Sequence, residues 1–131
     1  MTTDAVLLDA NVLIAVHFED HFHFAIADAW LKDRRFASTP STQGSLLRYT
    51  LRIADPVRAA TVLDVLSGNP HHEFWPDDTP YQPAMLFGVF GHRQLTDAYL
   101  ANAAFARETR LVTFDAGLKT LRPDVVELLR P

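Results

Sequence analysis

Short apolar runs alternate along the chain with stretches of helical periodicity. A continuous apolar run that ends at a polar residue is typical of a strand buried on both faces of a parallel sheet. Such runs predict strands over 5–8, 36–38, 111–114 and 125–128, with a shorter strand over 72–75 in a proline-rich loop. Apolar positions at helical spacing predict helices after Asp9 and over 23–31, 40–55, 57–66 and 98–110.

This alternation favours an α/β fold with a mainly parallel sheet, right-handed crossovers and helices on both faces. The 131 residues, of which 48% are hydrophobic and 21% charged, predict a single domain over 1–131. Cysteine is absent, which excludes thiol catalysis, thiolate zinc sites and disulfides. The first nine residues include two acids, and no later run approaches the ~18 apolar residues of a membrane span. We therefore expect a cytoplasmic protein with no membrane partner.

The net charge of −4, from 16 acidic and 12 basic residues, does not favour a general nucleic-acid binder. The charge is unevenly distributed, however. Residues 34–63 contain five arginines and one acid, and the helix predicted there places Arg48 and Arg52 one turn apart. A charged helix face is ordinarily just solvated. We favour the interpretation that these two arginines, which share a helix with Gln43, bind nucleic-acid phosphates.

Three aspartates are the candidate site residues. Asp9 and Asp115 each follow an apolar strand, and Asp97 opens a predicted helix. Ligands of open α/β sheets bind outside the carboxyl ends of the strands. Three converging carboxylates repel one another unless a cation joins them, and hard oxygen ligands without His or Cys suit Mg²⁺ or Mn²⁺. Metal-assisted hydrolysis is the chemistry expected of such a group.

Each aspartate alone is explained as well by helix capping. Two polar residues near these aspartates in the sequence favour a shared functional site over three separate helix caps. Asn11 follows Asp9 by two residues, and Thr113 precedes Asp115 by two, so that Thr113 and Asp115 fall on one strand face.

The local sequences also resemble a known family. The segments LLDANVL (7–13), HRQLTDAYL (92–100) and LVTFD (111–115) are similar, in order and spacing, to the acidic motifs of PIN-domain ribonucleases, in particular VapC-type toxins of bacterial toxin–antitoxin pairs. The segments STPSTQ (38–43) and FWPDD (74–78) also resemble that family, so that the resemblance covers nearly the whole chain.

The resemblance implies a three-layer α/β/α PIN-like domain with about five parallel strands. It further implies Mg²⁺-dependent endonucleolytic cleavage of RNA, with Mn²⁺ as a substitute metal, a homodimer, and inhibition by a cognate antitoxin. Asp9, Asp97 and Asp115 match the acids that hold the metal and carry catalysis. Asn11 matches a residue that supports the site, and Thr113 is positioned to contact the metal or its water.

One position departs from the family pattern. Many members have Glu where this chain has Gln43. An amide can hydrogen-bond a metal-bound water but brings no charge. We therefore expect Gln43 to support the site and the free protein to bind one Mg²⁺ tightly, with any second ion recruited together with the substrate.

Two other function classes remain open at this point. One is a catalytically weak PIN-like module that binds RNA or protein, and the other is a different Mg²⁺-dependent phosphoester hydrolase on a similar α/β frame. The aromatic side chains are expected to pack in the core or a subunit interface rather than to stack on bases; they are Phe22, Phe24, Trp30, Phe87, Phe90, Tyr99 and Phe105. Stacking of bases on Trp75 or Tyr81 has no support in the sequence.

Overall fold

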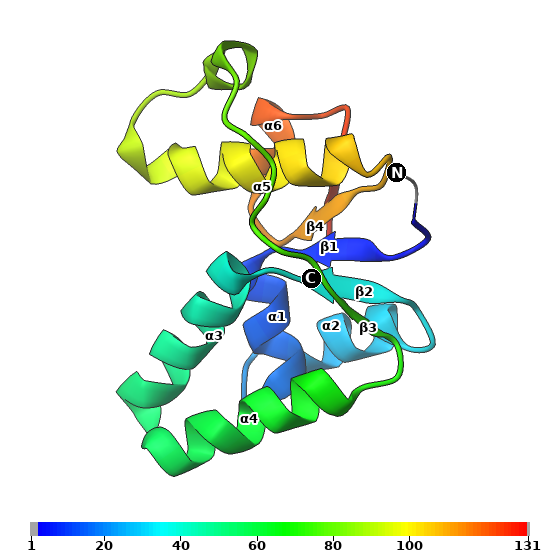
Figure 1. Ribbon diagram of the computed structural model, residues 1–131. Coiled ribbons are helices and arrows are strands. Elements are labelled where there is room, and N and C mark those ends of the chain that lie inside the picture. Colours follow the sequence, from blue (N-terminus) through cyan, green and yellow to red (C-terminus); the bar gives the residue numbers. More distant parts are fainter. Residues whose placement is uncertain (1–2, 131) are drawn as a thin grey trace.

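A computed structural model describes residues 3–130 and shows one five-stranded sheet between two layers of helices (Figure 1). The strands are β1 (Val6–Leu8), β2 (Phe36–Ser38), β3 (His72–Phe74), β4 (Leu111–Thr113) and β5 (Val126–Leu128). Their order in the sheet is β3-β2-β1-β4-β5, and every pairing is parallel. The predicted α/β fold with a parallel sheet is confirmed.

The helices divide between the two faces of the sheet. They are α1 (Ala10–His17), α2 (Phe24–Leu31), α3 (Pro40–Ile53), α4 (Pro56–Gly68), α5 (Leu95–Ala106) and α6 (Ala116–Leu121). In Figure 1, α5 and α6 cover one face and α1 to α4 cover the other. Alternation along β1 follows this division, because Leu7 packs in the α5 core whereas Val6 and Leu8 pack in the α1 core.

Polar caps and prolines fix the starts of several helices. Thr39 forms a reciprocal capping box with Thr42, and Pro40 follows as the first residue of α3. Asp55 caps α4 in the same way, with its carboxylate accepting from the amide of Arg58 at 2.8 Å, and Pro56 comes next. These caps place the start of α3 at the edge of the sheet where β1 and β2 end.

The segment between β3 and α5 was only partly anticipated. It carries two short 3₁₀ helices, Pro83–Leu86 and His92–Gln94, and the second leads into α5. Trp75 is only 2% exposed and packs in the α5 core, which removes it as a base-stacking candidate. Phe22, Phe87, Phe90 and Phe105 are exposed, so these four rings lie outside the core of this chain.

Helices α5 and α6 differ from the sequence-based prediction. Helix α5 begins at Leu95 and ends at Ala106 instead of extending to Arg110, and Glu108 adopts a positive φ of 57° just beyond it. Helix α6 was not predicted, because it has only six residues and contains Gly117, a poor helix former. No helix within residues 3–130 is long and apolar enough to cross a membrane.

Candidate active site

Asp9 is held at the carboxyl end of β1, the central strand. Its Oδ1 accepts from the amide of Ala10 at 2.8 Å and caps α1, and its Oδ2 accepts from the Thr113 hydroxyl at 2.7 Å. The residue is 7% exposed. Burial raises the pKa of Asp9, opposed by these two hydrogen bonds, and the charge of Asp115 raises it further. The chain thus keeps a carboxylate at a position where its ionised form is costly.

The hydroxyl of Thr113 joins the ends of β1 and β4. Besides donating to Asp9, it accepts from Asn11 Nδ2 at 3.2 Å and from the amide of Asp115 at 3.0 Å. Asn11 closes the group, since its Oδ1 accepts from the amide of Phe114 at 3.3 Å. The Thr113 hydroxyl therefore contacts Asp9 directly, and Asn11 is connected to Asp9 through Thr113.

Asp97 lies in the first turn of α5, two residues after Leu95. Its carboxylate does not cap the helix, and no hydrogen bond to it forms within the described residues. Burial, followed by the charges of Asp9 and Asp115, raises the pKa of Asp97 to about 6. Helix capping therefore explains Asp9 and Asp115, whereas Asp97 does not cap a helix and has only the favourable position of an acid in the first turn of α5.

Asp115 is exposed and caps α6, with Oδ1 accepting from the amide of Gly117 at 2.8 Å. Its effect on the pKa of both other aspartates shows that the three carboxylates are neighbours. None of the three forms a salt bridge with a basic side chain within residues 3–130. The charges of the three aspartates thus act on one another, and their convergence on one metal ion stays a prediction.

A pocket of about 430 Å³ opens between the starts of α1, α3 and α5. Asp9 and Asp97 line it together with Arg48, Ser41 and Thr96. Asp115 is not among its lining residues, and no three His, Asp or Glu side chains of the described chain are arranged so that they could already hold a metal ion. Binding one ion through all three aspartates would require their side chains to draw together.

The donor set nevertheless suits a hard divalent cation. Three carboxylates supply only oxygen ligands, which Mg²⁺ and Mn²⁺ prefer. Their mutual repulsion is uncompensated by any Lys or Arg ion pair within residues 3–130. A bound cation would relieve the costs that raise the pKa of Asp97, so the residues present fit such an ion.

Gln43 points away from this pocket. Its Nε2 donates to Ser38 Oγ at 3.0 Å, and the same hydroxyl lies 2.7 Å from His72 Nε2, below the sheet edge. The helix explains the direction, because Ser41 and Arg48 face the pocket and Gln43 lies about 200° around α3 from Ser41. This spacing was available in the sequence. The Gln43 side chain therefore does not line the pocket, and a direct role at the metal stays a prediction.

Arg48 connects the acidic pocket to a second depression. It lines both the pocket of Asp9 and a cavity of about 530 Å³ that includes Arg52 and Leu51. Both arginines are exposed, and neither pairs with a carboxylate in the described part of the chain. The guanidinium of Arg48 donates to Ser45 Oγ at 3.3 Å. Two free cations therefore lead away from the acidic pocket along α3.

Ser41, Thr96 and Asp77 are residues of the site region that the sequence did not single out. Ser41 and Thr96 line the acidic pocket, and the Ser41 hydroxyl donates to Asp77 Oδ2 at 2.9 Å. Asp77 and Ser41 also line an adjoining pocket of about 410 Å³. The signal was present, since Ser41 and Asp77 both fall in segments that resemble the family's.

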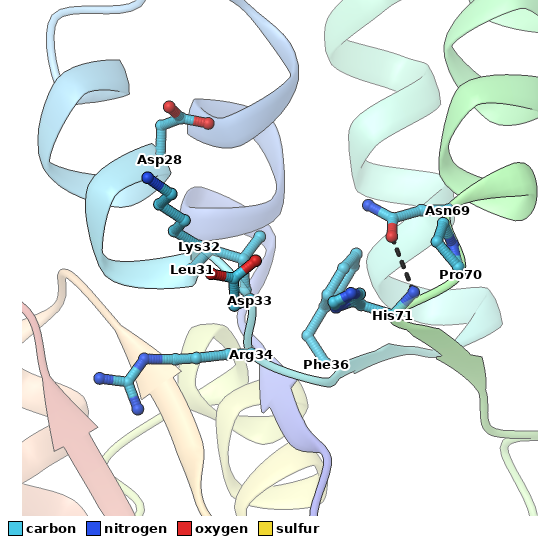
Figure 2. Close-up of a pocket in the computed structure, with 9 residues that line it drawn as sticks. All are labelled: Asp28, Leu31, Lys32, Asp33, Arg34, Phe36, Asn69, Pro70 and His71. Atoms are coloured by element: carbon cyan, nitrogen blue, oxygen red, sulfur yellow. Dashed lines mark hydrogen bonds between the residues drawn. The ribbon is translucent and has the colours of Figure 1, made fainter.

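A further pocket of about 480 Å³ lies at the opposite edge of the sheet, where β2 and β3 begin (Figure 2). Two of its polar side chains, Arg34 and Asn69, are engaged in local contacts. Arg34 Nε donates to the carbonyl of Trp30 at 2.6 Å, and its guanidinium lies 4.4 Å from that indole ring. Asn69 Oδ1 accepts from the amide of His71 at 2.9 Å. The acids and bases here are interspersed, so this edge offers no convergent carboxylates.

Comparison with known proteins gives consistent relationships. The sequence profile of the PIN domain matches residues 6–122. Ribonuclease VapC29 of Mycobacterium tuberculosis strain H37Rv is 45% identical over 127 residues, which cover 95% of this chain and 96% of the relative. Ribonuclease VapC38 of the same strain is 35% identical, over 94% of this chain and 96% of its own.

A solved structure supports the fold independently. The crystal structure of VapBC2 from Rickettsia felis, bound to a DNA fragment from their promoter, contains a chain that superposes with a TM-score of 0.66. The match covers 96% of this chain and 99% of that chain at 14% identity. At that identity the superposition concerns the three-layer architecture alone.

Proposed function

Because the chain belongs to the PIN-domain family and groups with its VapC members, we propose that it is a metal-dependent endoribonuclease, the toxin of a toxin–antitoxin pair. Both relatives are named as ribonucleases, and they match nearly the whole chain. The proposed reaction is hydrolysis of an RNA phosphodiester.

The position of Asp97 is the observation that supports this proposal most strongly. Its partly buried carboxylate lines the same pocket as Asp9 and has no hydrogen-bond donor or cation in the described residues. Burial and the charges of Asp9 and Asp115 raise its pKa to about 6. A strongly perturbed group in a pocket is typical of functional sites. A carboxylate kept under such conditions is well suited to bind a cation.

Asp9, Asp97 and Asp115 are the residues that would hold Mg²⁺, with Mn²⁺ as a substitute. When bound, the ion supplies Lewis-acid polarisation of the phosphodiester and acidifies a water for hydrolysis. Asp9 is oriented by the Thr113 hydroxyl at 2.7 Å, which leaves its pocket-facing side available. Asn11 holds Thr113 and the backbone before Asp115, so these two polar residues position the ligands.

Arg48 is the proposed phosphate-binding residue nearest the reaction centre. It lines the same pocket as Asp9 and Asp97, and its planar guanidinium can bind a phosphate through two hydrogen bonds. Arg52, in the adjoining cavity, extends the cationic surface by one helical turn. Together they place positive charge beside the acids, where an RNA backbone would otherwise be repelled.

A cognate antitoxin and a second copy of this chain are the proposed protein partners. Support for the antitoxin comes from the VapC relatives and from the Rickettsia felis structure of VapBC2. The second copy rests on the resemblance to the family alone. The RNA substrate is proposed on the same relatives and on the arginines beside the pocket.

The proposal is tested by incubating the purified protein with total cellular RNA in Mg²⁺ or in EDTA. Discrete fragments are expected only with the metal, and Asp97→Asn should abolish them because it removes a ligand charge. Asp64→Asn is the matched control, since Asp64 is an exposed acid on α4. Absence of Mg²⁺-dependent fragments, or fragments that persist with Asp97→Asn, would contradict the proposal.

A further inference from the structure

An exposed phenylalanine, Phe22, lies between α1 and α2. The Phe22 side chain is 85% exposed. Its ring lies 3.8 Å from the ring of His23 and 5.6 Å from that of His21, almost parallel to the latter at 13°. A large apolar ring in this position costs hydration free energy and adds little to the core.

The ring of His23 connects Phe22 to the site. His23 stacks on Phe114 with 4.4 Å between ring centroids and 16° between planes. Phe114 directly precedes Asp115, and its amide donates to Asn11, which also donates to Thr113. Two ring contacts therefore lead from the exposed face of Phe22 to residues that position the carboxylates.

The platform formed by Phe22, His23 and Phe114 is ordered by packing before any ligand arrives. His23 Nδ1 is buried and has no hydrogen-bond partner within residues 3–130, so stacking is what holds this ring. His21 is fixed on the other side, where its Nδ1 accepts from the amide of His23 at 3.1 Å and its ring lies 6.5 Å from Tyr49. The exposed ring thus has a rigid support.

The chemistry of the segment indicates which part of an RNA it would contact. Residues 17–23 contain two acids and no Lys or Arg. Such a segment does not attract phosphates, whereas every nucleobase has an aromatic face that stacks on Phe or His. Phosphate contacts are provided instead on α3, by Arg48 in the acidic pocket.

We propose that Phe22, supported by His23 and Phe114, is a stacking platform for an unpaired RNA base beside the phosphodiester that is cleaved. This inference rests on the proposed ribonuclease function and extends it to substrate selection. Stacking needs a base that is free of a duplex, so the platform favours single-stranded RNA or a loop over a continuous helix.

Fluorescence anisotropy with two labelled probes tests the platform. One is a single-stranded RNA dodecamer of random sequence, and the other is a dodecamer of abasic ribose phosphate. Both are titrated in Mg²⁺ with Asp97→Asn protein, which prevents cleavage. Adding Phe22→Ala should raise the Kd for RNA roughly 5- to 100-fold, as expected for the loss of one stacked base, and Phe22→Trp should restore binding. The Kd for the abasic probe should not change.

Phe105→Ala is the matched control, because Phe105 is 58% exposed at the far end of α5 and should leave both affinities unchanged. An unchanged RNA affinity with Phe22→Ala, or an equal loss for the abasic probe, overturns the platform. The platform is also overturned if Phe22→Ala changes the molar mass of the protein measured by light scattering but does not change its affinity for RNA. That result would assign Phe22 to a contact between copies of this chain. Circular dichroism should show all variants folded, since these side chains are exposed.

The outcome is separable from that of the proposed function. Metal-dependent cleavage by the unsubstituted protein, combined with RNA binding that ignores Phe22, overturns the platform alone. Base-dependent binding through Phe22 without any cleavage supports the platform and overturns the hydrolytic activity. A protein that binds neither RNA probe overturns both.

Discussion

Replacing Asp97 by Asn is expected to make the metal-free protein more stable at neutral pH while abolishing its activity. The folded state raises the pKa of Asp97 from 3.8 to about 6, mainly by burial and then by the charges of Asp9 and Asp115. The folded chain therefore holds this proton more tightly than the unfolded chain does. Asparagine has nearly the same shape without the charge, so it removes the cost of ionisation.

The magnitude follows from the size of the shift. About two pKa units, at 1.36 kcal/mol each, correspond to about 3 kcal/mol, and solvent screening of this partly exposed carboxyl reduces that to roughly 1–2 kcal/mol. Over 131 residues, an unfolding entropy of about 2.1 cal/mol/K per residue converts this to a rise in Tm of roughly 4–7 °C.

The pH dependence has a defined sign. At a pH well below 3.8 the carboxyl is protonated in both states, and Asp97 should cost nothing relative to Asn. The cost should grow as the pH rises towards about 6 and be complete above about 7. Taking the difference in Tm between the two proteins at each pH cancels the titration of the other acids.

Thermal unfolding in EDTA from pH 4 to 8 measures this difference, with Asp64→Asn as the exposed control. Repeating the series in Mg²⁺ should stabilise the unsubstituted protein more than Asp97→Asn, because only the former keeps the full ligand set. The reasoning is refuted if Asp97→Asn lowers Tm at pH 7.5 in EDTA, or if the difference does not change with pH.

Three further predictions concern the same site. Thr113→Val should lower the free energy of unfolding by about 1–3 kcal/mol and slow cleavage, because Asp9 loses the hydroxyl that donates to it at 2.7 Å. Urea unfolding and an RNA cleavage assay measure the two effects, and a variant with unchanged stability and activity would contradict the prediction. Arg48→Ala should reduce the slope of log Kd for RNA against log salt concentration by about 0.7, whereas Arg34→Ala at the opposite edge of the sheet should leave the slope unchanged. Equal slopes for Arg48→Ala and the unsubstituted protein would exclude a phosphate contact by Arg48. Calorimetric titration of the free protein should show one tightly bound Mg²⁺, and two tight ions would refute the single-metal interpretation.

The sequence predicted β1, β2 and β4 well because these three strands are buried on both faces. Each apolar run is bounded by a polar residue, so that Asp9 and Asp115 were identified at strand ends before their surroundings were known. The side-chain partners of Asp9 were also predictable in part, because Asn11 and Thr113 are close to the acids in sequence. Their hydrogen bonds to one another depend on β1 and β4 pairing, which local patterns do not reveal.

Other features depended on tertiary structure. The start of α5 is set by the 3₁₀ turn at His92–Gln94, so Asp97 is inside the helix instead of capping it. Phe22 has an apolar side chain that reads as core, and only the geometry of the α1–α2 connection exposes it. Helical spacing alone predicts that Gln43 points to a different side of α3 from Ser41 and Arg48. The resemblance to the family instead led us to expect Gln43 to support the site.

The central place of β1 in the sheet makes the candidate site depend on segments that are distant in sequence. The hydroxyl that orients Asp9 at the end of β1 belongs to Thr113, which follows Asp9 by 104 residues. The pairing of β1 with β4 brings the two together. A fragment that ends before β4 therefore lacks both Thr113 and Asp115, and it cannot form the complete group of carboxylates.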